Sequence, residues 1–205
     1  MTRIVADITV SLDGFVTGPD PSPTDGLGTG GETLHRWAFS DDPDDQRILN
    51  EGTIRSGAVV LGRRLFDVVD GPAGWDEQTG YGAGEVGTPP FVVVTSTPPT
   101  TVRLDHLDWT FVTTGLADAI AAARGRAQAA STDSGEDRDV IVMGGGETIG
   151  SALAAGLVDA LSLHLAPVLL GSGTPLFAAG PPRNLVRRSV TATTTATHLV
   201  YDVLR

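Results

Sequence analysis

The sequence predicts an α/β fold in which a mostly parallel central sheet is closed by an antiparallel hairpin at the C-terminal end. Short apolar runs alternate with helical patterns along the chain, which is typical of this class. Residues 185–204 instead alternate threonine with apolar side chains, as expected for antiparallel strands with one solvated face. The 205 residues show neither a repeat nor a linker, so we expect a single domain over residues 1–205.

The individual elements follow from the same patterns. Leu116, Ile120, Ala123 and Ala127 share one face of a helix expected over residues 116–130. Residues 71–90 are rich in glycine and proline and predict a long loop, and residues 131–138 predict a polar one. Strands are expected at residues 4–10, 58–61, 91–95, 109–113, 139–143 and 160–170, and further helices at 44–56, 62–69 and 147–156.

Composition excludes several kinds of chemistry. All 14 basic residues are arginine and there is no cysteine, so Schiff-base chemistry, a P-loop lysine, thiolate catalysis and disulfides are ruled out. The four histidines are scattered and form no HExxH pair. Glu32 and His35 make a single E-x-x-H, whereas a di-metal site needs two such pairs, so we expect no metal site. A net charge of −11 disfavours nucleic acids and anionic membranes as partners. Without a signal peptide or a long apolar run, a cytoplasmic protein is expected.

The strongest local signal is the segment DVIVMGGGETI at residues 139–149, where a buried strand meets three glycines and a helix. Glycines allow close approach of a ligand, and free N–H groups at a helix start favour phosphate. The segment is not a GxGxxG fingerprint, because Ile149 stands where the third glycine would be. A tight turn without a ligand is the alternative. The candidate phosphate-binding residues are Gly144, Gly145, Gly146, Glu147, Thr148 and Ile149.

Two other strand ends carry groups suited to phosphate. In VVLGRRLF, Gly62 is followed by Arg63 and Arg64, whose planar guanidinium donors match the geometry of a phosphate. Two cations at the start of a helix oppose the helix dipole unless an anion binds beside them, which also favours a phosphate here. The strand FVVVTS ends in the hydroxyls of Thr95 and Ser96. Solvated arginines and ordinary strand ends are the alternative. Because open α/β sheets bind ligands at their carboxyl edge, the three ends together predict a nucleotide with more than one phosphate.

A fourth motif, SLDGFVTG, follows the first strand. Its Asp13 either faces a cleft or belongs to a plain Asp-Gly turn.

In this order, SLDGFVTG, VVLGRRLF, FVVVTS, VIVMGGGETIG and the stretch at 156–177 resemble the dihydrofolate-reductase-like superfamily. Within it, the chain is most similar to the branch of the riboflavin biosynthesis reductase, the RibD C-terminal domain. The resemblance implies a three-layer fold, NADPH as cofactor, hydride transfer to a heterocycle or to a carbonyl or imine carbon, and a homodimer. It implies that residues 144–149 hold the pyrophosphate and that Val16 and Thr17 lie near the nicotinamide. It assigns the 2′-phosphate to the Gly62 turn, with Arg63 helped by Arg64, Thr95 and Ser96.

Departures from the family pattern bear on the substrate. Phe15 and Met143 stand where riboflavin-pathway reductases carry lysine and glutamate, and Leu34 stands where dihydrofolate reductases carry a carboxylate. We therefore expect another small substrate, with the riboflavin intermediate or dihydrofolate as alternatives. A non-catalytic nucleotide-binding protein and a structural protein without a ligand also remain.

Hydride transfer requires a proton. Water or Asp13 is the expected donor, with Trp37 and Trp75 as candidate pocket walls, and a carboxylate in this role would have to be buried to raise its pKa.

Overall fold

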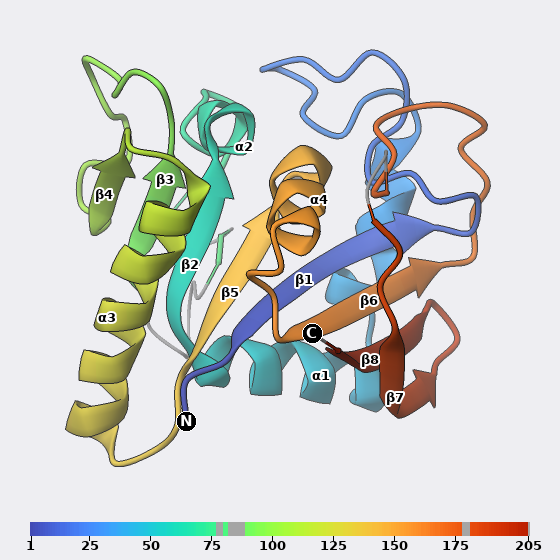
Figure 1. The fold of residues 1–205 in the computed structure, drawn as a ribbon. Helices are drawn as coiled ribbons and strands as arrows, with labels where there is room; N and C mark the ends of the chain where they lie inside the picture. The colour runs from blue at the N-terminus through green and yellow to red at the C-terminus, as the bar shows by residue number, and fades with distance from the viewer. Residues whose placement is uncertain (77–79, 82–88, 178–180, 205) are drawn as a thin grey trace.

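The computed structural model describes residues 1–76, 80–81, 89–177 and 181–204. Its described strands form one sheet in the order β4-β3-β2-β5-β1-β6-β8-β7 (Figure 1). The first six strands in the chain are parallel, while β8 runs antiparallel to both β6 and β7. The predicted sheet with its C-terminal hairpin is thus confirmed. The strands are β1 (Ile4–Ser11), β2 (Ser56–Gly62), β3 (Phe91–Val94), β4 (Trp109–Val112), β5 (Asp139–Gly144), β6 (Ala160–Ala166), β7 (Leu185–Ala192) and β8 (Thr197–Val203).

Helices cover both faces of the sheet and produce three layers (Figure 1). The helices α3 (Leu116–Ser134) and α4 (Gly146–Ala154) pack on one face against apolar side chains of β1, β2 and β5. The other face carries α1 (Pro43–Arg55), α2 (Arg63–Val69) and a 3₁₀ helix, η1 (Gly31–Phe39). Phe66 of α2 packs there with Phe91 of β3, and η1 contacts β1 and β6.

Local sequence explains where these elements begin and end. The helix α1 starts after Asp42, whose carboxylate accepts a hydrogen bond from the Asp44 backbone N–H, and Pro43 occupies the first turn. The strand β6 ends at Ala166 and not at residue 170 as predicted, because Pro167 lacks the N–H that a central strand needs. Of the face predicted for α3, Ile120, Ala123 and Ala127 are buried and Leu116 is half-buried; Ala119 is buried beside them.

One prediction about the loops was wrong, and one short helix was not predicted. The helix α3 continues to Ser134, because Ser131 donates its hydroxyl proton to the Ala127 carbonyl and the helix ends only at Gly135, with φ 72°. The glycine-rich stretch before Trp37 contains η1, which has too short a pattern to be predicted. Residues 77–79 and 82–88 of the loop predicted at 71–90 lie outside the described residues.

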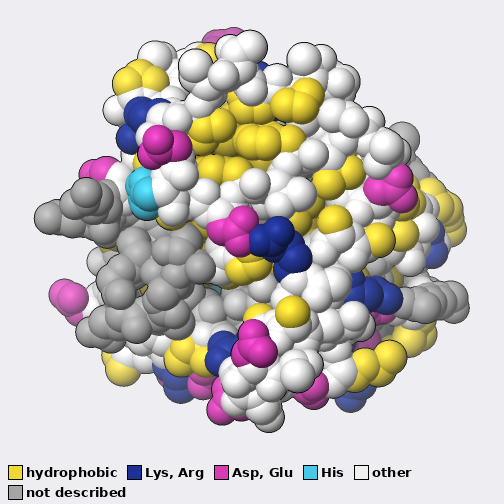
Figure 2. Space-filling model, turned by 90° about the vertical axis from the view of Figure 1, so that its left-hand side faces the viewer, with side chains coloured by type: hydrophobic (Ala, Val, Ile, Leu, Met, Phe, Trp, Pro, Cys, Tyr) yellow, Lys and Arg dark blue, Asp and Glu magenta, His cyan; other side chains and the backbone are white. Residues whose placement is uncertain are grey.

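None of the described helices has both the length and the apolar character needed to cross a bilayer. On the face shown in Figure 2, arginine side chains stand singly, several of them beside acidic ones, and form no continuous basic band. This distribution agrees with the net charge of −11.

Candidate functional site

The turn between β5 and α4 has the features of an anion-binding site. Gly144 has φ 125°, a conformation that favours glycine, and no side chain caps the start of α4 at Gly145. Within the described chain, the backbone N–H groups of Gly146 and Glu147 have no assigned acceptor. A Cβ atom added to Gly145 would meet nothing within 4 Å, so there is open space above the turn. Donors and space together suit a phosphate.

Glycines bring three of the predicted motifs into contact at this turn. A Cβ atom on Gly62, at the end of β2, would lie 2.2 Å from Thr148 Oγ1 in the first turn of α4. A Cβ atom on Gly146 would lie 2.8 Å from a methyl carbon of Val16, in the segment after β1. The absence of side chains at these two positions therefore allows β1, β2 and α4 to converge at the carboxyl edge of the sheet.

Arg63 links the end of β2 to the end of β3. Its Nε donates to Asp67 Oδ1 at 2.7 Å, and its Nη1 donates to Thr95 Oγ1 at 3.4 Å and to the Thr97 carbonyl. Its Nη2 has no assigned acceptor among the described residues, so part of the guanidinium remains available. Arg64 and Ser96 are exposed beside it.

The loop after β1 is tied to the segment that follows β6. Val16 N–H donates to the Thr174 carbonyl at 2.8 Å, and the Thr17 hydroxyl donates to Thr174 Oγ1 at 2.9 Å. Phe15 and Pro175 form an antiparallel bridge. The motif SLDGFVTG and the stretch at 156–177, far apart in sequence, therefore form one structural unit beside the glycine turn.

Asp13 is a tether in this unit, and its surroundings do not favour the predicted role of proton donor. Its carboxylate accepts hydrogen bonds from the Ser11 hydroxyl at 2.6 Å and from the N–H groups of Leu170 and Gly171 at 3.1 and 2.7 Å. The Ser11 bond first, and then the backbone bonds, hold the pKa of Asp13 below its usual value. The side chain is exposed. A group that stays ionised and solvated is a poor general acid near neutral pH.

The two tryptophans are structural. Trp37 is 6% exposed, stacks on His164 with 4.1 Å between ring centroids, and donates its Nε1–H to Thr9 Oγ1 at 2.9 Å. Trp75 packs on Phe91 at 5.5 Å. Neither arrangement supports the predicted role of a pocket wall.

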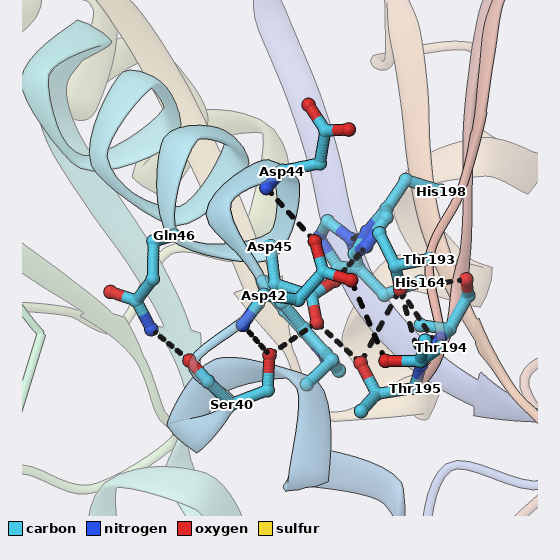
Figure 3. Close-up of polar contacts among 12 residues, drawn as sticks. Ser40, Asp42, Asp44, Asp45, Gln46, His164, Thr193, Thr194, Thr195 and His198 are labelled. Carbon is cyan, nitrogen blue, oxygen red and sulfur yellow. Dashed lines mark hydrogen bonds and ion pairs between the residues drawn. The ribbon is translucent and has the colours of Figure 1, made fainter.

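A polar cluster beneath η1 was missed by the sequence reading. Asp7, His164, His198 and Asp45 are joined in series by hydrogen bonds. Figure 3 shows His164, His198 and Asp45 of this series. The signal in the sequence that could have revealed it is that Asp7, His164 and His198 interrupt the mostly apolar strands β1, β6 and β8. Among the described residues, no group of three or more His, Cys, Asp or Glu side chains is arranged to hold a metal ion.

Comparison with known proteins places the chain in a family. The RibD C-terminal domain family matches residues 2–201. The chain belongs to the RibD C-terminal domain family. No curated protein matches the chain.

Solved structures share the fold of this RibD C-terminal domain protein. A putative riboflavin biosynthesis protein from Shewanella sp. PV-4 is 21% identical, with a TM-score of 0.66 and full coverage of both chains. A deaminase/reductase from Thermotoga maritima is 11% identical, with a TM-score of 0.64 over 99% of this chain and 57% of that one. Dihydrofolate reductase from Enterococcus faecalis, complexed with NADP(H), is 14% identical, with a TM-score of 0.54 over 98% and 96% of the chains. The dihydrofolate-reductase-like fold and the reductase family predicted from the motifs are confirmed, and the chain is an oxidoreductase.

Proposed function

We propose that the protein is an NADPH-dependent reductase whose cofactor lies along the carboxyl edge of the sheet. Two neighbouring features carry this proposal. The uncapped start of α4 lies against Gly62 and Val16, and the partly free guanidinium of Arg63 lies one strand away. Both ends of a dinucleotide that carries an additional phosphate would find donors there.

The residues fit the cofactor in the following way. The N–H groups of Gly146 and Glu147 would hold the pyrophosphate, with Gly144 and Gly145 leaving room for it and with Thr148 and Ile149 fixing the helix behind them. Arg63 would hold the 2′-phosphate, assisted by Arg64, Thr95 and Ser96 around the Gly62 turn. Val16 and Thr17 would border the nicotinamide. When bound, the cofactor supplies a hydride, and the protein orients it against the substrate.

The substrate we propose is small and carries a heterocyclic, carbonyl or imine carbon as hydride acceptor. Phe15 and Met143 are partly buried, so this side of the site is less polar than a lysine and a glutamate would make it. The riboflavin-pathway intermediate and dihydrofolate are the alternative substrates. If the protein reduces one of these two faster than it reduces the other acceptors, that compound is favoured as the substrate.

The cofactor assignment is tested by titrating intrinsic fluorescence with NADPH and NADH. Loss of a charge-assisted hydrogen bond costs about 1.5–3 kcal/mol, so Arg63→Ala should weaken NADPH binding by roughly 10- to 100-fold and leave NADH almost unchanged. Arg47→Ala is the control, since Arg47 is also an exposed helical arginine with carboxylate partners but lies on α1. Equal NADPH affinity in Arg63→Ala and the wild type would contradict the assignment.

Catalysis is distinguished from mere nucleotide binding by following cofactor absorbance with a panel of quinones, cyclic imines, dihydropterins and the pyrimidinedione intermediate. Steady NADPH oxidation with any of them excludes a non-catalytic nucleotide-binding protein. Binding of NADPH without any turnover would favour that second candidate.

We also propose that the protein is a homodimer. Val190, Leu199 and Leu163 lie opposite one another on β7, β8 and β6, and none of the three is fully buried. Burial of this row against a second copy would remove apolar surface from water. Light scattering after size exclusion should give a dimer for the wild type and a monomer for Val190→Arg; a monomeric wild type would contradict the proposal.

A further inference from the structure

Four side chains form a hydrogen-bonded series that runs through the interior below η1. His164 Nε2 lies 3.1 Å from Asp7 Oδ1, the two Nδ1 atoms of His164 and His198 lie 2.7 Å apart, and His198 Nε2 lies 2.7 Å from Asp45 Oδ1. Each residue comes from a different element: β1, β6, β8 and α1. Figure 3 shows the two imidazoles side by side, with Asp45 below them and the threonines of the β7–β8 turn around it.

Counting protons fixes the charge of the histidine pair. An ionised carboxylate only accepts hydrogen bonds, so both Nε2 atoms must carry a proton. The Nδ1···Nδ1 contact requires one proton more, because two bare nitrogens 2.7 Å apart would face each other as acceptors. Three protons on two imidazoles mean that His164 and His198 together carry one positive charge.

The two carboxylates at the ends of the series favour this positive charge. Burial opposes ionisation of Asp7 and Asp45, but hydrogen bonds and the histidines outweigh it and lower the pKa of both carboxyls, that of Asp45 to about 2. Burial lowers the pKa of His198, and repulsion from His164 acts in the same direction, whereas the Asp45 carboxylate favours the protonated form of His198. Trp37 stacks on His164 and offers its ring face to the charge.

Only one end of the series is open. The Asp45 side chain is 0% exposed, and its other oxygen accepts hydrogen bonds from Ser40 and Thr195. The Asp7 side chain is 33% exposed. A proton can therefore leave or enter the series through Asp7.

The open end lies next to the proposed cofactor turn. Ala6 pairs with Val142 across β1 and β5, which places Asp7 level with Met143, the residue directly before Gly144. Tyr81 is close enough for the charge of Asp7 to raise its pKa, an effect smaller than that of burial. On the other side, η1 contributes His35, whose pKa is lowered first by burial and then by His164, and whose buried Nδ1 has no partner among the described residues.

We propose that the His164–His198 pair stores the proton that follows the hydride and delivers it to the substrate through Asp7. This inference rests on the proposed function. The hydride adds to the acceptor carbon, and the electron pair released onto the neighbouring nitrogen or oxygen requires a proton. The ionised Asp7 carboxylate accepts the Nε2 proton of His164 and passes it to that atom, so Asp7 ends ionised as it began. His164 keeps the shared proton on Nδ1 and becomes neutral, as does His198, and water recharges the series through Asp7.

The stored proton is tested first in the free protein by NMR of ¹⁵N-labelled histidine. At pH 7 the pair should hold three nitrogen-bound protons, one of them shared between the two Nδ1 atoms, and His198→Gln should remove the shared signal. The exposed His106 serves as internal reference. Two neutral imidazoles at pH 7 would overturn the proposal.

Delivery is tested by repeating the titration with NADPH and with NADP⁺, which differ by one positive charge on the nicotinamide. A unit charge within about 10 Å shifts a pKa by about one unit, so the pair should hold its proton about tenfold more weakly with NADP⁺. An identical proton affinity with both cofactors would overturn delivery. Failure of either cofactor to bind would overturn the proposed function and delivery together, whereas the proton count in the free protein would stand or fall by itself.

The exit is tested by a matched pair of variants. Asp7→Asn preserves the shape of the side chain but cannot carry a proton, so exchange of the shared proton with water should slow at least tenfold. Asp45→Asn makes the same change at the closed end and should slow exchange far less. Equal exchange rates in Asp7→Asn and the wild type would overturn the role of Asp7.

Discussion

The contact between Gly62 and Thr148 yields a quantitative prediction about how the cofactor turn is held. Gly62 has φ −78° and ψ 156°, so its backbone accepts alanine without strain. The added methyl would lie 2.2 Å from Thr148 Oγ1 but 3.5 Å from Thr148 Cβ. Carbon atoms pack best at about 3.5–4.0 Å, so only the hydroxyl obstructs the methyl. Gly62→Ala should therefore cost about 1–3 kcal/mol of unfolding free energy through overpacking.

A double-mutant cycle isolates this contact. Thr148→Ala removes the obstructing hydroxyl, so Gly62→Ala/Thr148→Ala should recover most of the loss and show a coupling energy of about 1–2 kcal/mol. Urea unfolding measures the free energies, and the melting temperature should move by roughly 2–4 °C per kcal/mol for a chain of this size. NADPH titration of the same four proteins should show weakened binding in Gly62→Ala alone. Additive free energies, or an undisturbed Gly62→Ala variant, would refute the packing argument.

Three further predictions concern single groups. Gly145→Ala should change the unfolding free energy by less than about 1 kcal/mol, because the methyl meets nothing within 4 Å, yet weaken NADPH binding at least tenfold; unchanged binding in a titration would place the cofactor elsewhere. The pKa of Asp45 is lowered from 3.8 to about 2 in the folded protein, so its ionised form stabilises the fold by about 2 kcal/mol above pH 4. This stabilisation should be lost as the pH falls from about 4 to 2. An Asp45→Asn variant with the same dependence of unfolding free energy on pH would contradict this prediction. Asp13→Ala should speed hydrogen exchange at the Leu170 and Gly171 amides without removing turnover, and protected amides there would show that Asp13 is not the tether.

Much of the fold was predictable because local pattern and tertiary structure agree. Buried apolar strands preceding glycine turns, as at Gly62 and Gly144, identify the carboxyl edge of a parallel sheet before any contact is known. The helical face of α3 was predictable from its 3.6-residue period. By contrast, η1 depends on packing against β1 and β6, and a short 3₁₀ helix has no period of its own to reveal it.

The candidate site was predictable in its parts but not in its connections. The glycine turn and Arg63 could be named as candidates because each motif is continuous in sequence. The tether formed by Asp13 was not predicted, because its partners Leu170 and Gly171 are brought to it only by the fold. The series from Asp7 to His198 was invisible for the same reason, since its members lie on four elements and a single residue on each carries no motif.

The central claim is that the start of α4 and Arg63 hold the two ends of one dinucleotide. A crystal structure with NADP⁺ tests it most directly. The account predicts the pyrophosphate against the N–H groups of Gly146 and Glu147, the 2′-phosphate against Arg63, and the nicotinamide beside Val16 and Thr17. A dinucleotide bound away from the β5–α4 turn, or a 2′-phosphate without contact to Arg63, would contradict it.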